Sequence, residues 1–179
     1  MTNVIMIIFS MLKDNYKLKN VFLRNNSLTK PPMHYISPQP VLDFLKKEHQ
    51  LAKEKGYYIG MKLVRGAYLE KENERAKEKG YPTPMCKSKL ETDTNFNNAV
   101  AYMLDNLNDM SIFIGSHNED SSYFAMQMMS EKGLKKNDDR VWFGQLYGMS
   151  DHISFNLASK GYNVAKYIPF GPVRDVMPY

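Results

Sequence analysis

From residue 41 onward, the chain alternates between a helical and a strand-like spacing of hydrophobic positions. Apolar residues between Val41 and Ala52 recur three and four positions apart, which predicts a helix that Gly56 ends. The following stretch, residues 57–64, is rich in strand-forming side chains and predicts a strand. The same alternation continues almost to the end of the chain.

Three more predicted strands follow, each preceded by at least one predicted helix. The helices are expected at 69–79, from a cap at Asp93 or Thr94 to 107, at 121–132 and at 151–159, and the strands at 111–115, 140–144 and 164–168. Nearly continuous apolar strands separated by helices predict a parallel α/β sheet covered by helices. Both an open doubly wound sheet and part of a (β/α)8 TIM barrel have this order. Because no Gly-x-Gly-x-x-Gly fingerprint opens a helix, we favour a partial, incomplete barrel.

The first 40 residues lack this regularity. Residues 13–30 are rich in Asn and Lys, and four prolines follow between positions 31 and 40. Proline fixes φ and removes a backbone donor, so this stretch should neither continue a helix nor sit in a central strand. We therefore expect a poorly structured leader over residues 1–40, in which Val4–Leu12 is the one candidate strand, and a structured domain over 41–179.

Composition narrows the class of protein. The net charge is +5, but acids and bases alternate, as in residues 70–75, so the chain shows no basic patch for nucleic acid. Cys86 is the only cysteine, which excludes an internal disulfide or a cysteine-rich metal site, and no histidine spacing indicates a metal. The apolar run 4–12 is far shorter than the roughly 20 residues that span a bilayer, and no signal-peptide pattern surrounds it.

Polar and glycine-containing segments follow each predicted strand. They are Lys62–Tyr68, Ser116–Asn118, Phe143–Met149 and Lys166–Pro172. Functional side chains gather at the carboxyl ends of strands in both candidate architectures, so these segments predict a binding site. Each segment alone also has a structural explanation: a solvated strand end, a hydrogen-bonded histidine, a tight turn or a core aromatic side chain.

Together the segments spell Lys-Leu-Val-Arg-Gly-Ala-Tyr, Ser-His-Asn, Phe-Gly-Gln-Leu-Tyr-Gly-Met and Lys-Tyr-Ile-Pro-Phe-Gly-Pro-Val, in the order seen in proline dehydrogenases. Residues 41–179 resemble the C-terminal half of that FAD-dependent barrel, strands five to eight. The resemblance implies oxidation of L-proline to 1-pyrroline-5-carboxylate by hydride transfer to FAD, the first step of proline catabolism. It also implies a quinone acceptor, which is consistent with peripheral membrane association, and a cytoplasmic location, or a mitochondrial one in a eukaryote.

The resemblance also assigns roles to individual residues. Lys62 matches a basic residue near the flavin edge that receives the hydride, where a cation stabilises negative charge. Tyr68, Leu146 and Tyr167 match side chains around the substrate ring. The residues implied in flavin binding are Lys62, Val64, Arg65, Gly66, Ala67, Lys89, Ser116 and His117.

The chain departs from the family pattern at both ends. It stops at Tyr179, before the helix whose two adjacent arginines pair with the proline carboxylate, and it lacks family strands one to four. Half a barrel leaves open sheet edges and an uncovered face, so we expect this chain alone neither to bind FAD tightly nor to oxidise proline. The alternatives are a non-catalytic half-barrel fragment that needs a complementary chain to fold and bind flavin, and an open α/β domain for another ligand.

Overall fold

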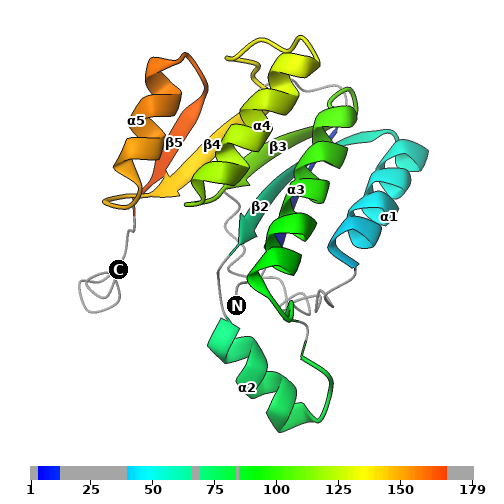
Figure 1. The fold of residues 1–179 in the computed structure, drawn as a ribbon. Helices are drawn as coiled ribbons and strands as arrows, with labels where there is room; N and C mark the ends of the chain where they lie inside the picture. Colours follow the sequence, from blue (N-terminus) through cyan, green and yellow to red (C-terminus); the bar gives the residue numbers. More distant parts are fainter. Residues whose placement is uncertain (1–3, 13–39, 66–68, 84, 169–179) are drawn as a thin grey trace.

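A computed structural model describes residues 4–12, 40–65, 69–83 and 85–168 (Figure 1). Its sheet has five strands in the order β1-β2-β3-β4-β5. The strands are β1 (Val4–Leu12), β2 (Tyr57–Arg65), β3 (Met110–Gly115), β4 (Val141–Leu146) and β5 (Val164–Tyr167). The helices are α1 (Pro40–Lys55), α2 (Leu69–Lys79), α3 (Lys89–Asp105), α4 (Glu119–Glu131) and α5 (Asp151–Ser159). Strands β2 to β5 are parallel, whereas β1 pairs with β2 in the antiparallel direction.

Helices α1, α3, α4 and α5 lie on the same face of the sheet, and α2 lies below the sheet in the view of Figure 1. Alternate strand residues point into the layer between sheet and helices, where Leu63 and Ile114 are fully buried. Phe96 from α3 and Phe143 from β4 are the largest fully buried side chains of this core. In the part of the chain that the structure describes, no helix covers the opposite face, which we call the helix-free face.

A buried histidine connects α1 to the amino-terminal end of the sheet. His49 is only 3% exposed, and its Nδ1 lies 2.8 Å from the hydroxyl of Tyr102 in α3. Its Nε2 lies 3.4 Å from Asp109 Oδ2, just before β3, and Lys53 Nζ lies 3.2 Å from the same oxygen. Sequence reasoning assigns His49 no role, and its contacts are those of a structural brace at the end of the sheet away from the predicted site.

The predicted cap of α3 was wrong. The helix begins at Lys89, before Asp93 and Thr94, and its N-cap is Ser88, whose Oγ accepts a hydrogen bond of 3.1 Å from the backbone N–H of Glu91. The spacing Ser-x-x-Glu is the sequence signature of a helix start and lies one turn earlier than the predicted cap. This shift places Asp93 inside the helix.

The other predicted helices and strands after residue 41 are confirmed, with ends that agree within two residues. The candidate strand Val4–Leu12 is present as β1 at the edge of the sheet, while residues 13–39 lie outside the described residues. The parallel sheet of four strands, β2 to β5, is confirmed.

The buried position of Leu63 yields a test of this core. Leu63→Ala should lower the free energy of unfolding by about 2–5 kcal/mol, because the side chain is 0% exposed and its loss leaves a cavity under the helices. Leu90→Ala is the matched control, since Leu90 is 76% exposed, and should change it by less than about 0.5 kcal/mol. Urea denaturation measures both, and equal losses would contradict the assignment of the covered face.

Candidate functional site at the carboxyl edge of the sheet

The four parallel strands end at one edge of the sheet. In their register Val64 lies opposite Gly115, Gly115 opposite Gly144, and Leu146 opposite Tyr167. Because register neighbours in adjacent strands point to the same face, Val64, Leu146 and Tyr167 all project from the helix-free face. The structure thus gathers side chains from distant segments on one uncovered surface.

Lys62 connects the first and the last of these parallel strands. Its Nζ lies 3.6 Å from the centroid of the Tyr167 ring and 5.7 Å from that of Phe113, and the two rings meet edge to face at 5.6 Å. A cation on an aromatic face is an attractive electrostatic contact. Burial lowers the pKa of the Lys62 ammonium below its usual 10.5 and raises the pKa of Tyr167 above 10.0.

Two glycines leave room for this contact. A Cβ on Gly115 would lie 3.0 Å from the carbonyl oxygen of Leu63 and 3.3 Å from Lys62 Cε. A Cβ on Gly144 would lie 2.1 Å from Cε1 of Phe113, so a larger residue there requires the ring to move. The Lys62 side chain and the Phe113 ring therefore lie where the sheet carries no side chain.

Arg65 turns to the opposite, helix-covered face. Its side chain is 9% exposed, and Nη1 lies 2.6 Å from Asp93 Oδ1, at an angle that makes an ion contact rather than an aligned hydrogen bond. Nη1 also donates to Ser121 Oγ at 3.1 Å, and the guanidinium lies 5.6 Å from the Phe96 ring centroid. The second oxygen of Asp93 pairs with Lys89 Nζ at 2.6 Å. Arg65 and Lys89 thus share one carboxylate, and Arg65 fixes the end of β2 to α3 and α4.

Ser116 and His117 follow β3 and contact the segments next to them. Ser116 is 2% exposed, and its carbonyl oxygen accepts a hydrogen bond of 3.3 Å from the buried amide of Gln145. His117 is exposed, and its Nδ1 lies 2.9 Å from Ser150 Oγ in the loop after β4. Partial burial and the nearby charge of Lys166 lower the pKa of His117 below 6.5, so the imidazole is mostly neutral at pH 7.

Lys166 holds the loop between β4 and α5. Its Nζ donates to the carbonyl oxygens of Met149 at 2.7 Å and Leu146 at 3.4 Å, and it pairs with Asp151 Oδ1 at 2.6 Å. The next residue, Tyr167, points to the other face because strand side chains alternate. Adjacent residues of β5 therefore anchor the loop on one face and contact Lys62 on the other.

The residues predicted for the site separate into three groups. Lys62, Val64, Leu146 and Tyr167 lie on the helix-free face, Arg65 and Lys89 meet on the helix-covered side, and Ser116 and His117 lie at the strand ends between them. Gly66, Ala67 and Tyr68 lie outside the described residues.

Sequence reasoning missed Phe113. The signal was present: Phe113 alternates with Ile112 and Ile114, which are buried under the helices, so it must point to the other face. What the sequence did not show is that the same face carries Lys62 and Tyr167 within reach of its ring.

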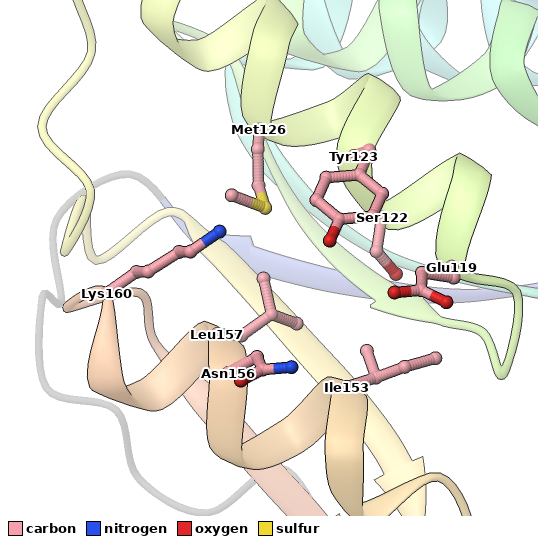
Figure 2. Close-up of a pocket in the computed structure, with 8 residues that line it drawn as sticks. All are labelled: Glu119, Ser122, Tyr123, Met126, Ile153, Asn156, Leu157 and Lys160. Atoms are coloured by element: carbon pink, nitrogen blue, oxygen red, sulfur yellow. The ribbon is translucent and has the colours of Figure 1, made fainter.

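Two hollows lie outside this surface. Figure 2 shows a cleft between α4 and α5, lined by Glu119, Ser122, Tyr123, Met126, Ile153, Asn156, Leu157 and Lys160. A second hollow lies beside β5 and α5, where Tyr147 is 65% and Phe155 is 69% exposed. Neither hollow contains Lys62 or Tyr167. Among the described residues, no group of three or more His, Cys, Asp or Glu side chains is placed to hold a metal ion, and no helix is long and apolar enough to cross a membrane.

The fold and this edge define an α/β protein of the class that places its ligand-facing residues at the carboxyl ends of parallel strands. The family model for proline dehydrogenase matches residues 39–179, most of the chain. The chain belongs to the proline dehydrogenase family.

Individual relatives agree with this assignment. Proline dehydrogenase 1, mitochondrial, from Homo sapiens is 45% identical over 133 residues, which cover 73% of this chain and 22% of the human protein. The carbapenem antibiotics biosynthesis protein CarD of Pectobacterium carotovorum is 38% identical over 138 residues, 77% of this chain and 34% of that protein. The crystal structure of proline utilization A from Bdellovibrio bacteriovorus, inactivated by N-propargylglycine, is similar with a TM-score of 0.73 at 27% identity, over 80% of this chain and 15% of that one. The chain thus spans about a third of the length of the CarD protein and less than a quarter of the other two.

The Arg65–Asp93 contact gives a prediction on stability. Asp93→Ala should lower the free energy of unfolding by about 1–3 kcal/mol, because it removes the carboxylate in contact with a largely buried guanidinium and leaves only the more distant Asp120. The double variant Arg65→Met/Asp93→Leu leaves no buried charge and should lose less. Asp105→Ala is the matched control, since Asp105 is 54% exposed in its pair with Lys132, and should cost less than about 1 kcal/mol. Chemical denaturation that ranks Asp105→Ala with Asp93→Ala would refute this.

The lowered pKa of Lys62 gives a prediction on pH. At pH values between the pKa of Lys62 in the folded chain and its value near 10.5 in the unfolded chain, the unfolded chain binds more protons than the folded one. Lys62 therefore makes the free energy of unfolding increase as pH rises through this interval. Lys62→Met should lack this gain, whereas Lys89→Met should keep it, because Lys89 is 70% exposed. Urea denaturation from about pH 8 to about pH 9.5, below the tyrosine range, measures the slope. The same slope in wild type and Lys62→Met would count against the buried ammonium.

Proposed function

We propose that this chain is the flavin- and proline-facing part of a proline dehydrogenase, which oxidises L-proline to 1-pyrroline-5-carboxylate by hydride transfer to FAD. The observation that carries the proposal is the contact of 3.6 Å between Lys62 Nζ and the Tyr167 ring, at the carboxyl edge of a parallel sheet in a member of this family. In this proposal residues 41–179 form the C-terminal half of the barrel, and residues 1–40 are a leader without a match in the family, whose strand β1 joins the sheet antiparallel to β2.

The sheet order supports a partial (β/α)8 barrel. Strands β2 to β5 are neighbours in the order of the sequence, without the reversal that marks a doubly wound sheet. In a barrel the helices lie outside, and the other face of the sheet becomes the packed interior. The helix-free face, with Lys62, Phe113 and Tyr167, would be that interior, so β2 to β5 correspond to barrel strands five to eight.

The helix-free face suits a planar, electron-accepting ring. Gly115 and Gly144 keep the sheet free of side chains there, and the Lys62 ammonium is partly removed from water beside them. When bound, FAD supplies the acceptor for the hydride that leaves the proline carbon next to the nitrogen. Lys62 would stabilise negative charge that develops at the acceptor, which is worth more in a site that excludes water.

The other residues would orient the two rings. Tyr167 and Leu146, which are register neighbours, would form the wall beside the substrate ring. Val64, Ser116 and His117 would contact the flavin. Arg65 and Lys89 would act at the flavin's polar end through the charge cluster at the start of α3. For Gly66, Ala67 and Tyr68 we propose the roles that the resemblance implies.

The final electron acceptor would be a quinone, by family analogy, reached through peripheral membrane association. The relatives from Homo sapiens, Drosophila melanogaster and Arabidopsis thaliana are named as mitochondrial proteins. We propose a mitochondrial location if the source of this chain is eukaryotic, and a cytoplasmic one otherwise.

A second candidate is a half-barrel that folds fully and binds flavin only with a complementary chain. Trp142 is 37% and Leu146 is 38% exposed on the helix-free face, and Tyr147 and Phe155 are more exposed beside β5. These apolar side chains lie where the remaining strands and helices of a barrel would pack. Their exposure at positions that further barrel elements would cover supports this candidate.

One experiment separates the two candidates. The chain is purified alone and together with the complementary N-terminal half of a relative's barrel, and both samples are assayed for flavin absorbance and proline-dependent dye reduction. A yellow, active chain alone supports the enzyme and excludes the need for a complement, whereas activity only in the mixture supports the half-barrel. Absence of flavin and of activity from both samples would refute the proposed function.

The same assay tests Lys62. In whichever sample is active, Lys62→Met should lower kcat about 10²–10³-fold, the loss expected when one charge-stabilising group is removed from a site. Lys132→Met is the control, because Lys132 pairs with Asp105 away from the helix-free face. Equal activities of the two variants would remove Lys62 from the reaction.

A further inference from the structure

We propose that Phe113 is a positioning residue of this site, and that its ring, seated over Gly144, sets the places of Lys62 and Tyr167. The effect of Phe113 on catalysis rests on the proposed function, whereas the contacts of Phe113 with Lys62 and Tyr167 do not depend on it. Neither the family motifs nor the sequence pattern assigns Phe113 or Gly144 this role.

The three side chains form a closed triangle. Lys62 Nζ lies 3.6 Å from the Tyr167 ring centroid, Lys62 Nζ lies 5.7 Å from that of Phe113, and the two ring centroids are 5.6 Å apart at an interplanar angle of 61°. An edge-to-face pair has a preferred orientation, because the positive edge of one ring meets the negative face of the other. Phe113 thus restricts the orientation of Tyr167, which in turn offers its face to the ammonium.

The position of Phe113 explains how residues of non-adjacent strands meet. Lys62 is in β2 and Tyr167 is in β5, and β3 and β4 lie between them. Phe113 comes from β3, and its ring reaches across β4 because Gly144 has no side chain: a Cβ there would lie 2.1 Å from Cε1 and 2.4 Å from Cζ. The ring of Phe113 therefore occupies the space that a side chain at position 144 would fill.

This complementarity predicts coupled effects. Gly144→Ala should push the Phe113 ring toward Lys62 and Tyr167 and disturb their contact. Once Phe113 is Leu, the methyl group has less to displace, so Gly144→Ala should have little further effect. A double-mutant cycle measures this difference directly, since residues in contact give non-additive effects.

The readout is the environment of Lys62 in the full chain alone, without flavin. Lysines are dimethylated with 13C, and the Lys62 methyl resonance is identified by its absence in Lys62→Arg. In the wild type this resonance should be shifted upfield by the Tyr167 ring. Phe113→Leu should move it at least halfway to the position of exposed lysines, whereas Phe155→Leu, the same substitution at a 69% exposed site, should leave it unchanged.

The outcomes decide the inference independently of the enzyme. The inference is supported if the upfield shift of the Lys62 methyl resonance is lost in Phe113→Leu and in Gly144→Ala, and the double variant shows no further change. An unchanged Lys62 resonance in a folded Phe113→Leu chain, or additive effects in the cycle, overturns it. In the active sample, Phe113→Leu should lower kcat, because Lys62 is displaced, and raise the KM for proline, because Tyr167 is displaced, each several-fold. Unchanged kcat and KM in a Phe113→Leu sample would overturn the positioning role, whereas a wild-type sample without activity would refute only the proposed function.

Discussion

Strand residues point alternately to the two faces of a sheet, and the helices that the structure describes cover only one of them. That constraint divides β2 to β5 between two tasks. Met61 and Leu63 point into the core under α1 and α3. Lys62, which lies between them in the sequence, points to the helix-free face. The core thereby fixes the strand that carries the cation, and it does so without occupying the space around the ammonium.

The polar contacts follow the same division. Arg65 and Lys166 use the helix-covered side, where Arg65 joins β2 to Asp93 and Lys166 joins β5 to Asp151 and the preceding loop. Each is next in sequence to a residue that points to the helix-free face: Arg65 follows Val64, and Lys166 precedes Tyr167. These charged side chains hold the strand ends. Breaking a partly buried ion pair costs more free energy of unfolding than breaking an ion pair on the exposed surface. On the helix-free face, Lys62, Phe113 and Tyr167 therefore contact one another rather than the residues that hold the strand ends.

The chain covers only a small part of the length of its relatives. It spans 22% of the human relative and 15% of the similar bacterial structure, yet the carboxyl ends of its four parallel strands lie at one edge of the sheet. The face that carries those ends also exposes Trp142 and Leu146, which a closed barrel would enclose. Binding of a ligand and packing of further barrel elements would thus use the same surface.

Local patterns in the sequence determined the helices, the strands and the motifs of the family, because periodicity, caps and glycines act over a few residues. They misplaced the start of α3, since Ser88 and Glu91 form a cap one turn before Asp93. Only the tertiary structure decided that Asp93 faces Arg65, that Phe113 lies over Gly144, and that Lys62 reaches Tyr167. These contacts join residues 28, 31 and 105 positions apart. They depend on the register and order of the strands and on the packing of α3, which no local spacing specifies.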